Sequence, residues 1–220
     1  MQEKHEKPSV TVDIVIFTIK ENNLQVLLVK RGIEPFKNQW AIPGGFVKID
    51  ESLEEAAKRE LQEETGVKDV YLEQLYTFGS PKRDPRGRVI TVSYIALVNS
   101  SDINLKASTD VSDAQWFAVS DIPIIAFDHK EILQYALKRL KWKFEYTTVA
   151  FSLLPKEFTI SQIQKLYEIV FNKEFDKRNF AKKILSLNIL KEEGINHEVS
   201  HRPPMLYSLK NNIGEIIEIL

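Results

Sequence analysis

A concentration of glutamates on one short segment constrains this chain more than any other feature. On a helix of 3.6 residues per turn, Glu60 lies one turn before both Glu63 and Glu64, so the three carboxylates crowd one edge. Like charges at these spacings destabilise a bare helix, and a hard divalent cation with oxygen ligands offsets the repulsion. The segment therefore favours a helix whose acidic edge binds a metal ion.

The two ends of this helix are marked in the sequence. Ser52 and Glu55 have the spacing of a capping box, and Gly66 stands where a helix C-terminus is expected. We therefore expect a helix over residues 53–65. A narrow apolar stripe on it would pack on a sheet: Leu53, Ala57 and Leu61.

Strands surround this helix in the first two-thirds of the chain. They are expected, from β-branched, aromatic and apolar composition, at residues 9–19, 24–29, 69–79, 88–98 and 114–119, with a hairpin turn at 21–23. A second helix begins near Asp128 and carries apolar residues as far as Leu140. Many strands around a helix predict an α/β (α+β) sandwich rather than a repeating βαβ fold.

The remaining residues follow a different order of elements. Thr159 and Gln162 form a second capping-box spacing, with Ile163, Leu166, Val170 and Phe171 on one helical face. A short helix over residues 177–187 places Phe180, Ile184 and Leu187 inward, and two short strands follow at 189–190 and 206–209. Helix, turn, helix and hairpin is the order of a winged helix-turn-helix. We place the boundary between two domains, 1–147 and 148–220.

Composition excludes several classes of function. The chain has no cysteine, which rules out disulfides, thiolate zinc sites and cysteine nucleophiles and fits a reducing cytoplasm. Residues 1–8 are polar, without the apolar core of a signal peptide, and no apolar run approaches the length of a membrane helix. We expect a cytoplasmic protein that does not enter the membrane.

The glutamates belong to a longer pattern with nine specified positions. They are Gly45, Glu51, Arg59, Glu60, Leu61, Glu63, Glu64, Gly66 and Val67. Glutamate-rich helices are common and usually face solvent, but the whole pattern resembles the signature of the Nudix hydrolases. The resemblance implies a Nudix fold that holds Mg²⁺ or Mn²⁺ through Glu60, Glu63 and Glu64. It also implies that Glu51 is a further acidic residue near the metals and that Arg59 orients the carboxylates. Which glutamate is the general base stays open.

An arginine-rich loop precedes one expected strand. Arg83, Asp84, Arg86 and Arg88 lie in it, and it suits phosphate recognition or, equally, a solvated turn. Its amino-acid sequence resembles that of the corresponding loop in Nudix ADP-ribose pyrophosphatases, and the resemblance implies an ADP-ribose-like ligand. The expected ligand-binding residues are Arg31, Gly44, Gly45, Arg83, Asp84 and Arg86. The glycine pair would permit a tight turn. Trp40 could stack on a base or belong to the core, and we favour the core.

Basic residues gather near the second short helix of the C-terminal domain. If its apolar residues face the core, Arg178, Asn179, Lys182, Lys183 and Ser186 are left on the outer surface. The residues expected to contact DNA in a major groove are Lys177, Arg178, Asn179, Lys182 and Lys183. The loop of residues 197–204, with His201 and Arg202, would be the wing. The alternative is an ordinary solvated surface.

The whole chain resembles the Nudix-related transcriptional regulators, which join a Nudix domain to a winged helix. Residues 126–129 and 202–207 are similar to stretches of those proteins. The resemblance implies a homodimer on a double-stranded DNA operator. It also implies that ADP-ribose or a pentose controls the regulator. Because every residue of the Nudix pattern is present, we expect the protein to hydrolyse its effector as well. The competing hypotheses are a housekeeping ADP-ribose pyrophosphatase whose second domain dimerises and a regulator that only senses sugar.

Overall fold

The computed structural model describes residues 7–66, 70–99, 111–195, 203–211 and 217–219. The chain divides into two compact units. The first contains residues up to 18 and residues 25–137, and the second contains residues 19–24 and residues from 138 onward. The division falls inside helix α2, whereas the boundary at 147/148 stays a prediction.

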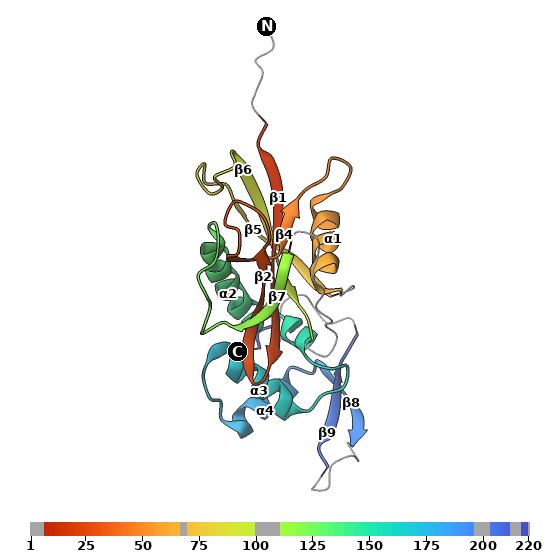
Figure 1. Ribbon diagram of the computed structural model, residues 1–220. Coiled ribbons are helices and arrows are strands. Elements are labelled where there is room, and N and C mark those ends of the chain that lie inside the picture. Colours follow the sequence, from red (N-terminus) through yellow and green to blue (C-terminus); the bar gives the residue numbers. More distant parts are fainter. Residues whose placement is uncertain (1–6, 67–69, 100–110, 196–202, 212–216, 220) are drawn as a thin grey trace. The chain divides into compact units, whose positions relative to one another are not determined.

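The first unit is built on a mixed sheet (Figure 1). Within the described residues seven strands join it, in the order β3-β2-β1-β6-β5, with β4 paired to β1 and β7 paired to β2. The bounds are β1 Ser9–Lys20, β2 Asn23–Arg31, β3 Trp40–Ala41, β4 Gly44–Phe46, β5 Tyr71–Phe78, β6 Val89–Leu97 and β7 Val111–Ala118. The five expected strands are present, and β3 and β4 were not predicted because each is only two or three residues long.

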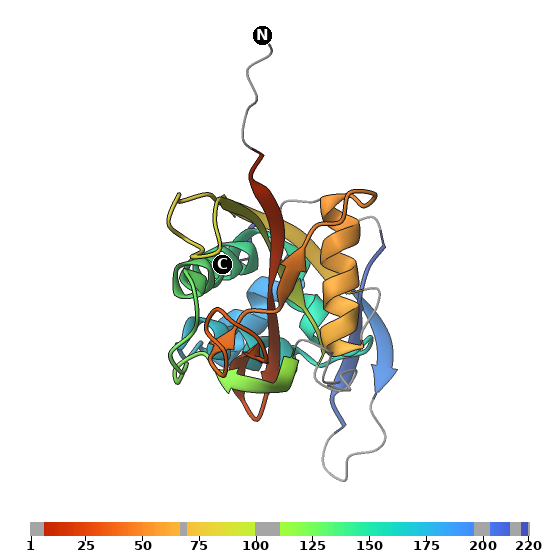
Figure 2. The same ribbon diagram turned by 45° about the horizontal axis from the view of Figure 1, so that its top comes forward.

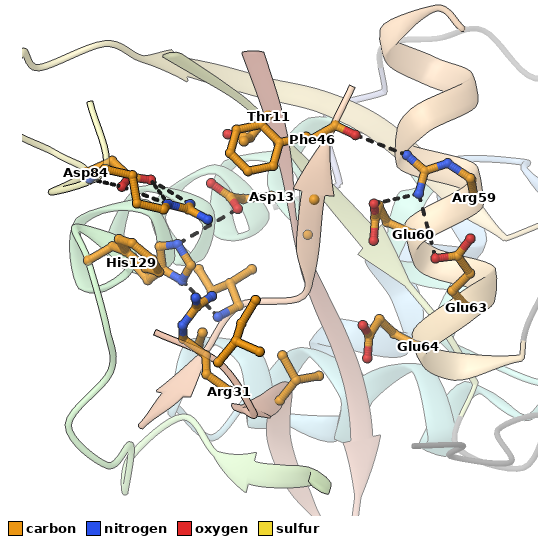
Figure 3. A pocket seen from close by; sticks show the side chains of 18 of the residues that line it. Thr11, Asp13, Arg31, Phe46, Arg59, Glu60, Glu63, Glu64, Asp84 and His129 are labelled. Carbon is orange, nitrogen blue, oxygen red and sulfur yellow. Dashed lines mark hydrogen bonds and ion pairs between the residues drawn. The ribbon is translucent and has the colours of Figure 1, made fainter. Parts of the chain in front are cut away.

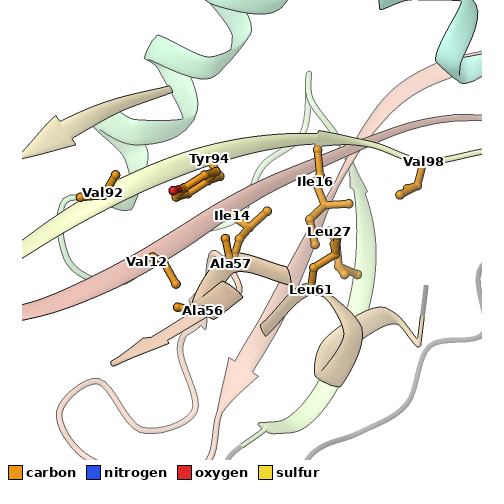
Figure 4. Packing of buried hydrophobic residues seen from close by; sticks show 11 residues of the cluster. Val12, Ile14, Ile16, Leu27, Ala56, Ala57, Leu61, Val92, Tyr94 and Val98 are labelled. Atoms are coloured by element: carbon orange, nitrogen blue, oxygen red, sulfur yellow. The ribbon is translucent and has the colours of Figure 1, made fainter. Parts of the chain in front are cut away.

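Strand β1 lies at the centre of this sheet, and its two faces carry different kinds of side chain. It pairs in parallel with β6 from Ser9 opposite Val89 to Phe17 opposite Leu97. Val12, Ile14 and Ile16 point to one face, where they pack with Ala56, Ala57 and Leu61 of α1 (Figure 4). Side chains alternate along a strand, so Thr11 and Asp13 point to the other face. Figures 1 and 2 show α1 and the beginning of α2 on opposite sides of the sheet.

Helix α1, Leu53–Thr65, has the expected ends. Ser52 accepts a hydrogen bond from the Glu55 amide, and the Glu55 side chain accepts one from the Ser52 amide, which makes a complete capping box. Gly66 adopts a left-handed conformation with φ of 71°, which glycine reaches without strain. The helix that carries the acidic edge is therefore positioned by local signals at both ends.

Helix α2, His129–Tyr146, is longer than the sequence indicated. Beyond Leu140 the expected apolar period ends, yet the helix continues to Tyr146, and Phe144 is fully buried. A 3₁₀ helix, η2, follows at Thr148–Leu153 and was not predicted; it buries Val149, Ala150, Phe151 and Leu153. Tertiary burial rather than local periodicity decides these boundaries.

The second unit has the winged-helix order of elements. Helix α3 spans Ile160–Phe171, α4 spans Lys177–Ser186, and strands β8 (Leu190–Ile195) and β9 (Met205–Leu209) pair antiparallel. The capping box of Thr159 and Gln162 is formed. Phe158 bridges to Tyr207, so a third short segment joins the hairpin. Most of the predicted wing, residues 197–202 of 197–204, lies outside the described residues.

The core of the second unit differs in part from the predicted one. Ile163, Leu166, Val170, Phe180 and Ile184 are buried as expected. Phe171 and Leu187 are only half-buried. Tyr167 is fully buried instead, and its hydroxyl donates to the Phe144 carbonyl at 3.0 Å. A tyrosine was not an obvious core residue, but a bonded hydroxyl makes its burial favourable.

No helix among the described residues has both the length and the apolar character needed to cross a membrane.

His129 ties the start of α2 to the sheet. The Ile42 amide donates to its Nδ1 at 2.9 Å, and its Nε2 lies 3.8 Å from Asp13 Oδ1. Because Nδ1 accepts a hydrogen bond, the ring is neutral with its proton on Nε2. Burial lowers the pKa of His129 below its ordinary value of 6.5, against the opposing effect of the Asp13 carboxylate.

This environment predicts a loss of stability in mild acid. In the unfolded chain His129 binds a proton near pH 6.5, whereas in the folded chain it stays neutral to a lower pH. The contribution of the neutral ring to the free energy of unfolding is therefore complete above about pH 6.5 and decreases as the pH falls. Denaturant unfolding should show this loss, by at most about 1.4 kcal/mol per pH unit. His129→Asn keeps an acceptor for Ile42 without titrating, and its stability should depend less on pH. An identical pH dependence in both proteins would contradict this assignment.

Candidate active site and DNA-binding surface

A pocket of about 360 Å³ lies in the first unit. One side of it is the acidic edge of α1, and the other carries side chains of β1, the loop at residues 83–86 and the start of α2 (Figure 3). Ten of the eleven predicted catalytic and ligand-binding residues line it: Arg31, Gly44, Gly45, Arg59, Glu60, Glu63, Glu64, Arg83, Asp84 and Arg86. The eleventh, Glu51, contacts the pocket residue Arg59. The structure thus brings all of them together, while their roles stay predictions.

Arg59 organises the carboxylates on the α1 side. Its Nε and Nη2 donate to the two oxygens of Glu51 at 3.0 and 2.7 Å, and its Nη1 donates to Glu60 at 2.6 Å. Glu63 lies 3.6 Å from the same Nη1. The hydrogen bonds from Arg59 and the Lys48 amide lower the pKa of Glu51 to about 2, so this carboxylate stays ionised.

Glu60 is a buried carboxylate that suits a cation. Burial raises its pKa above the ordinary value of 4.5, and the bond from Arg59 only partly opposes this effect. Figure 3 shows Glu60, Glu63 and Glu64 on the side of α1 that faces the pocket. Oxygen donors of this kind are the ligands that Mg²⁺ prefers. Among the described residues, no three Asp, Glu or His side chains are already arranged as a metal centre. Arg59 lies 2.6 Å from Glu60 and 3.6 Å from Glu63.

The glycine pair next to this edge lets other groups approach the backbone closely. The prediction that it forms a tight turn is wrong. Gly44 and Gly45 lie in strand β4, paired with Asp13 and Val12 of β1. A Cβ on Gly45 would lie 2.0 Å from Glu60 Oε1, and one on Gly44 would lie 2.3 Å from the Val12 carbonyl oxygen. Only glycine therefore lets the Glu60 carboxylate and strand β1 come this close.

Two arginines on the opposite side of the pocket are bound to carboxylates. Arg83 donates to both Asp128 oxygens at 2.8 and 2.7 Å and to Asp13 at 3.3 Å. Arg86 donates to Asp84 through Nε and Nη2, at 3.0 and 2.6 Å. Burial by itself lowers the pKa of Arg83, but the carboxylates outweigh it and raise the pKa. Arg83 and Asp84 are both buried, whereas residues 85–88 of the same loop are exposed, so only the first part of the loop departs from a solvated turn.

Several pocket residues were not among the predicted site residues. They are Thr11, Asp13, Phe46, Phe127 and His129, among others. Phe127 and His129 lie in the segment 126–129 that resembles the regulators, which was the available signal. Asp13 is a polar residue inside an apolar strand and could have been questioned on that ground. Thr11 and Phe46 carried no such signal.

Trp40 lies outside the pocket lining. Its ring packs edge-on against Phe117, with centroids 4.8 Å apart, and Lys30 Nζ lies 5.9 Å from its centroid. These contacts agree with a packing role rather than base stacking.

Helix α4 presents a basic surface. Asp176 caps it by accepting from the Asn179 amide at 2.8 Å, and Phe180 and Ile184 are buried on its inner face. All five polar residues of this helix that were predicted to contact DNA are exposed: Lys177, Arg178, Asn179, Lys182 and Lys183. His201 and Arg202 lie outside the described residues. The arrangement suits a helix that contacts phosphates and base edges.

The Gly45 geometry predicts a specific defect in cation binding. In Gly45→Ala the added methyl must displace the Glu60 carboxylate, because a contact of 2.0 Å is impossible. We expect Mn²⁺ affinity, measured by calorimetric titration of the full chain, to fall by about tenfold or more. Gly79→Ala is the control, since its Cβ would meet only Ile90 atoms at 3.9 and 4.0 Å. Equal Mn²⁺ affinity in the two variants would show that Glu60 does not contribute to cation binding.

Comparison with known proteins agrees with both parts of this description. The NUDIX domain model matches residues 7–136, and the NrtR DNA-binding winged helix domain matches residues 150–209. The ADPR responsive transcriptional repressor NtrR of Acinetobacter baylyi is 36% identical over 207 residues, which cover 92% of this chain and 82% of that protein. An ADP-ribose pyrophosphatase of Methanocaldococcus jannaschii is 40% identical over 136 residues, 62% of this chain and 75% of that protein.

A solved structure extends the likeness over both units. Shewanella oneidensis NrtR in complex with a 27mer DNA superposes with a TM-score of 0.81 at 36% identity, covering 91% of this chain and 93% of that one. Nudix hydrolases generally use divalent metal ions. The chain belongs to the Nudix family, among the NrtR-type transcriptional regulators in which a winged-helix DNA-binding domain follows the Nudix domain.

Proposed function

We propose that this protein is a transcriptional regulator that binds ADP-ribose in its Nudix pocket, hydrolyses it with Mg²⁺ or Mn²⁺, and binds operator DNA through α4. The observation that carries the proposal is the presence, in one chain, of a pocket with the complete acidic edge and of a helix with an exposed basic face. The names of the relatives support the ligand and the DNA.

The acidic edge of α1 has the composition for a diphosphate-cleaving site. Glu60, Glu63 and Glu64 would hold the divalent ion, which when bound neutralises charge on the diphosphate and activates the attacking water. Arg59 holds Glu51 and Glu60 in place, and Gly45 leaves room for Glu60. The bonds from Arg59 and the Lys48 amide lower the pKa of Glu51 to about 2, so it would add a negative charge beside the ion.

The exposed basic helix of the second unit favours the regulator hypothesis over that of a housekeeping enzyme. A pyrophosphatase that only dimerised through this unit would have no need for an exposed basic helix, whereas operator binding uses it directly. Winged-helix regulators often act as homodimers on palindromic operators, and we propose the same here. The proposed location is the cytoplasm.

Hydrolysis is tested by removing one carboxylate from the acidic edge. Glu63 faces the pocket with about half of its side chain exposed, so Glu63→Gln should fold normally and reduce metal-dependent AMP release from ADP-ribose by at least about tenfold. Glu54→Gln is the control, an exposed glutamate of α1 outside the pocket lining. If the wild-type protein releases no AMP with Mg²⁺ or Mn²⁺ but is stabilised by ADP-ribose, the enzymatic part is wrong and the regulatory part stands.

DNA binding is tested on the upstream region of the protein's own gene. Arg178→Ala combined with Lys182→Ala should weaken binding by at least about tenfold in a gel shift. The slope of log affinity against log salt should fall by about 1 for each phosphate that the variant no longer binds. Lys58→Ala with Lys130→Ala is the control, because it changes the net charge equally at exposed positions of the first unit. Retained binding in the α4 variant would rule out this helix as the DNA-binding element.

A further inference from the structure

The turn of residues 172–176 connects α3 to α4 in the second unit. Most of this turn is exposed, and Asp176 at its end caps α4. The residue before the cap, Phe175, is different, because side chains of α3 bind both its amide and its carbonyl group. Whatever fixes the backbone of Phe175 therefore also fixes the point and direction at which α4 begins.

Glu168 of α3 accepts hydrogen bonds from several backbone amides of this turn. Its own carbonyl oxygen accepts from the Asn172 amide and, at 3.2 Å, from the Lys173 amide. Its carboxylate Oε1 accepts from the Phe175 amide, also at 3.2 Å. Backbone amides outside a helix need acceptors of this kind. A single residue of α3 thus holds the turn from its first residue to the one before the cap.

Gln164 completes this arrangement one helical turn earlier. Its Nε2 donates to Glu168 Oε1 at 2.9 Å and to the Phe175 carbonyl oxygen at 2.8 Å. The two side chains are four positions apart on α3 and so lie on the same face of the helix. A side-chain amide has two N–H groups, and both are used here. We call Gln164 and Glu168 the turn bracket.

The ring of Phe175 carries this placement into α4. Its centroid lies 6.5 Å from that of Phe171 on α3 and 5.6 Å from that of Phe180 on α4. Phe180 is buried, and its ring also contacts Tyr167 of α3, with centroids 5.6 Å apart. The backbone of Phe175 is therefore tied to α3 by the bracket, while its side chain packs against the inner face of α4.

A carboxylate is an unexpected group in a unit that binds DNA. Phosphates repel it, so the charge of Glu168 by itself weakens DNA binding. The hydrogen bonds from Gln164 and the Phe175 amide lower the pKa of Glu168 below its ordinary value of 4.5, so the carboxylate is ionised at neutral pH. The bonds that Glu168 makes, rather than its charge, account for a glutamate at this position.

We propose that Gln164 and Glu168 are positioning residues for DNA recognition, which set the orientation of α4 by holding the backbone of Phe175. The inference rests on the proposed binding of operator DNA through α4 and adds residues that act on it through Phe175. Contacts to base edges carry the sequence information and need a fixed helix, whereas phosphate contacts are independent of sequence. The turn bracket should therefore contribute to the preference for the operator and little to affinity for DNA in general.

The test compares two DNAs in fluorescence anisotropy with the full chain: the upstream region of the protein's own gene and a random duplex of equal length. Glu168→Ala removes the acceptor for Gln164 and the Phe175 amide. Its affinity for the upstream DNA should fall by about tenfold or more, the size of effect that one mismatched base pair has. Its affinity for the random duplex should stay the same or rise, because a negative charge is lost.

Glu174→Ala is the matched control for charge. Glu174 is an exposed glutamate in the same turn, so the variant has the same net charge as Glu168→Ala. It should bind the upstream DNA at least as tightly as the wild type does. The charge change alone thus predicts tighter binding in both variants, whereas the turn bracket predicts weaker operator binding in Glu168→Ala only.

Two variants of similar shape separate the hydrogen bonds from the charge. Glu168→Gln keeps an oxygen that accepts both bonds, so its operator affinity should stay within about twofold of the wild type. Gln164→Met keeps the length and neutrality of the side chain but cannot donate, so it should reproduce the loss of operator affinity. Because the two residues act as one bracket, Gln164→Met combined with Glu168→Ala should cost no more than either change alone. Melting temperatures are measured for all variants, and Gln164→Met carries the test if Glu168→Ala fails to fold.

The outcomes distinguish this inference from the proposed function. If the wild type does not prefer the upstream DNA, or if Arg178→Ala with Lys182→Ala binds it normally, the proposed role of α4 is wrong and the turn bracket falls with it. If only Gln164→Met and Glu168→Ala keep the wild-type preference, the bracket alone is wrong. Equal losses in Glu168→Gln and Glu168→Ala would assign the effect to charge. Equal losses for both DNAs in Glu168→Ala would mean that the residue only supports the fold, and either result overturns the inference.

Discussion

The hydrogen bonds of Arg59 are the interaction on which the acidic site depends. Three glutamates on one edge of α1, with Glu51 in the preceding loop, would repel one another and loosen the helix. One guanidinium binds Glu51 with two donors and Glu60 with a third, so the charges are held together before any cation arrives. Gly45 completes this arrangement because its missing side chain lets Glu60 lie against strand β4.

On the opposite side of the pocket, ion pairs between arginines and carboxylates also hold the side chains in place. Asp13, Asp84 and Asp128 neutralise Arg83 and Arg86, and this network joins the middle of β1, the loop at residues 83–86 and the start of α2. His129 adds a neutral contact to the Ile42 amide. The pocket is therefore acidic beside α1 and nearly neutral, with aromatic rings, on the other side.

Local signals explain which parts of the molecule could be predicted. The ends of α1 and α3 follow from capping residues three positions apart, and the exposed face of α4 follows from its buried Phe180 and Ile184. Contacts between distant residues could not be predicted in this way. Asp13 meets Arg83 seventy positions away, and periodicity assigns a residue to a face without naming its partner. The sequence suggested a turn at the glycine pair, because the close approach of Glu60 to Gly45 is visible only in the three-dimensional structure.

The central claim is that a ligand in the Nudix pocket controls the binding of DNA by the same chain. Fluorescence anisotropy of the labelled upstream DNA, titrated with the full protein with and without ADP-ribose, tests it most directly. We expect ADP-ribose to change the dissociation constant for DNA by about fivefold or more, as is usual for coupled sites. The same dissociation constant with and without ADP-ribose, at concentrations that thermally stabilise the protein, would contradict the claim.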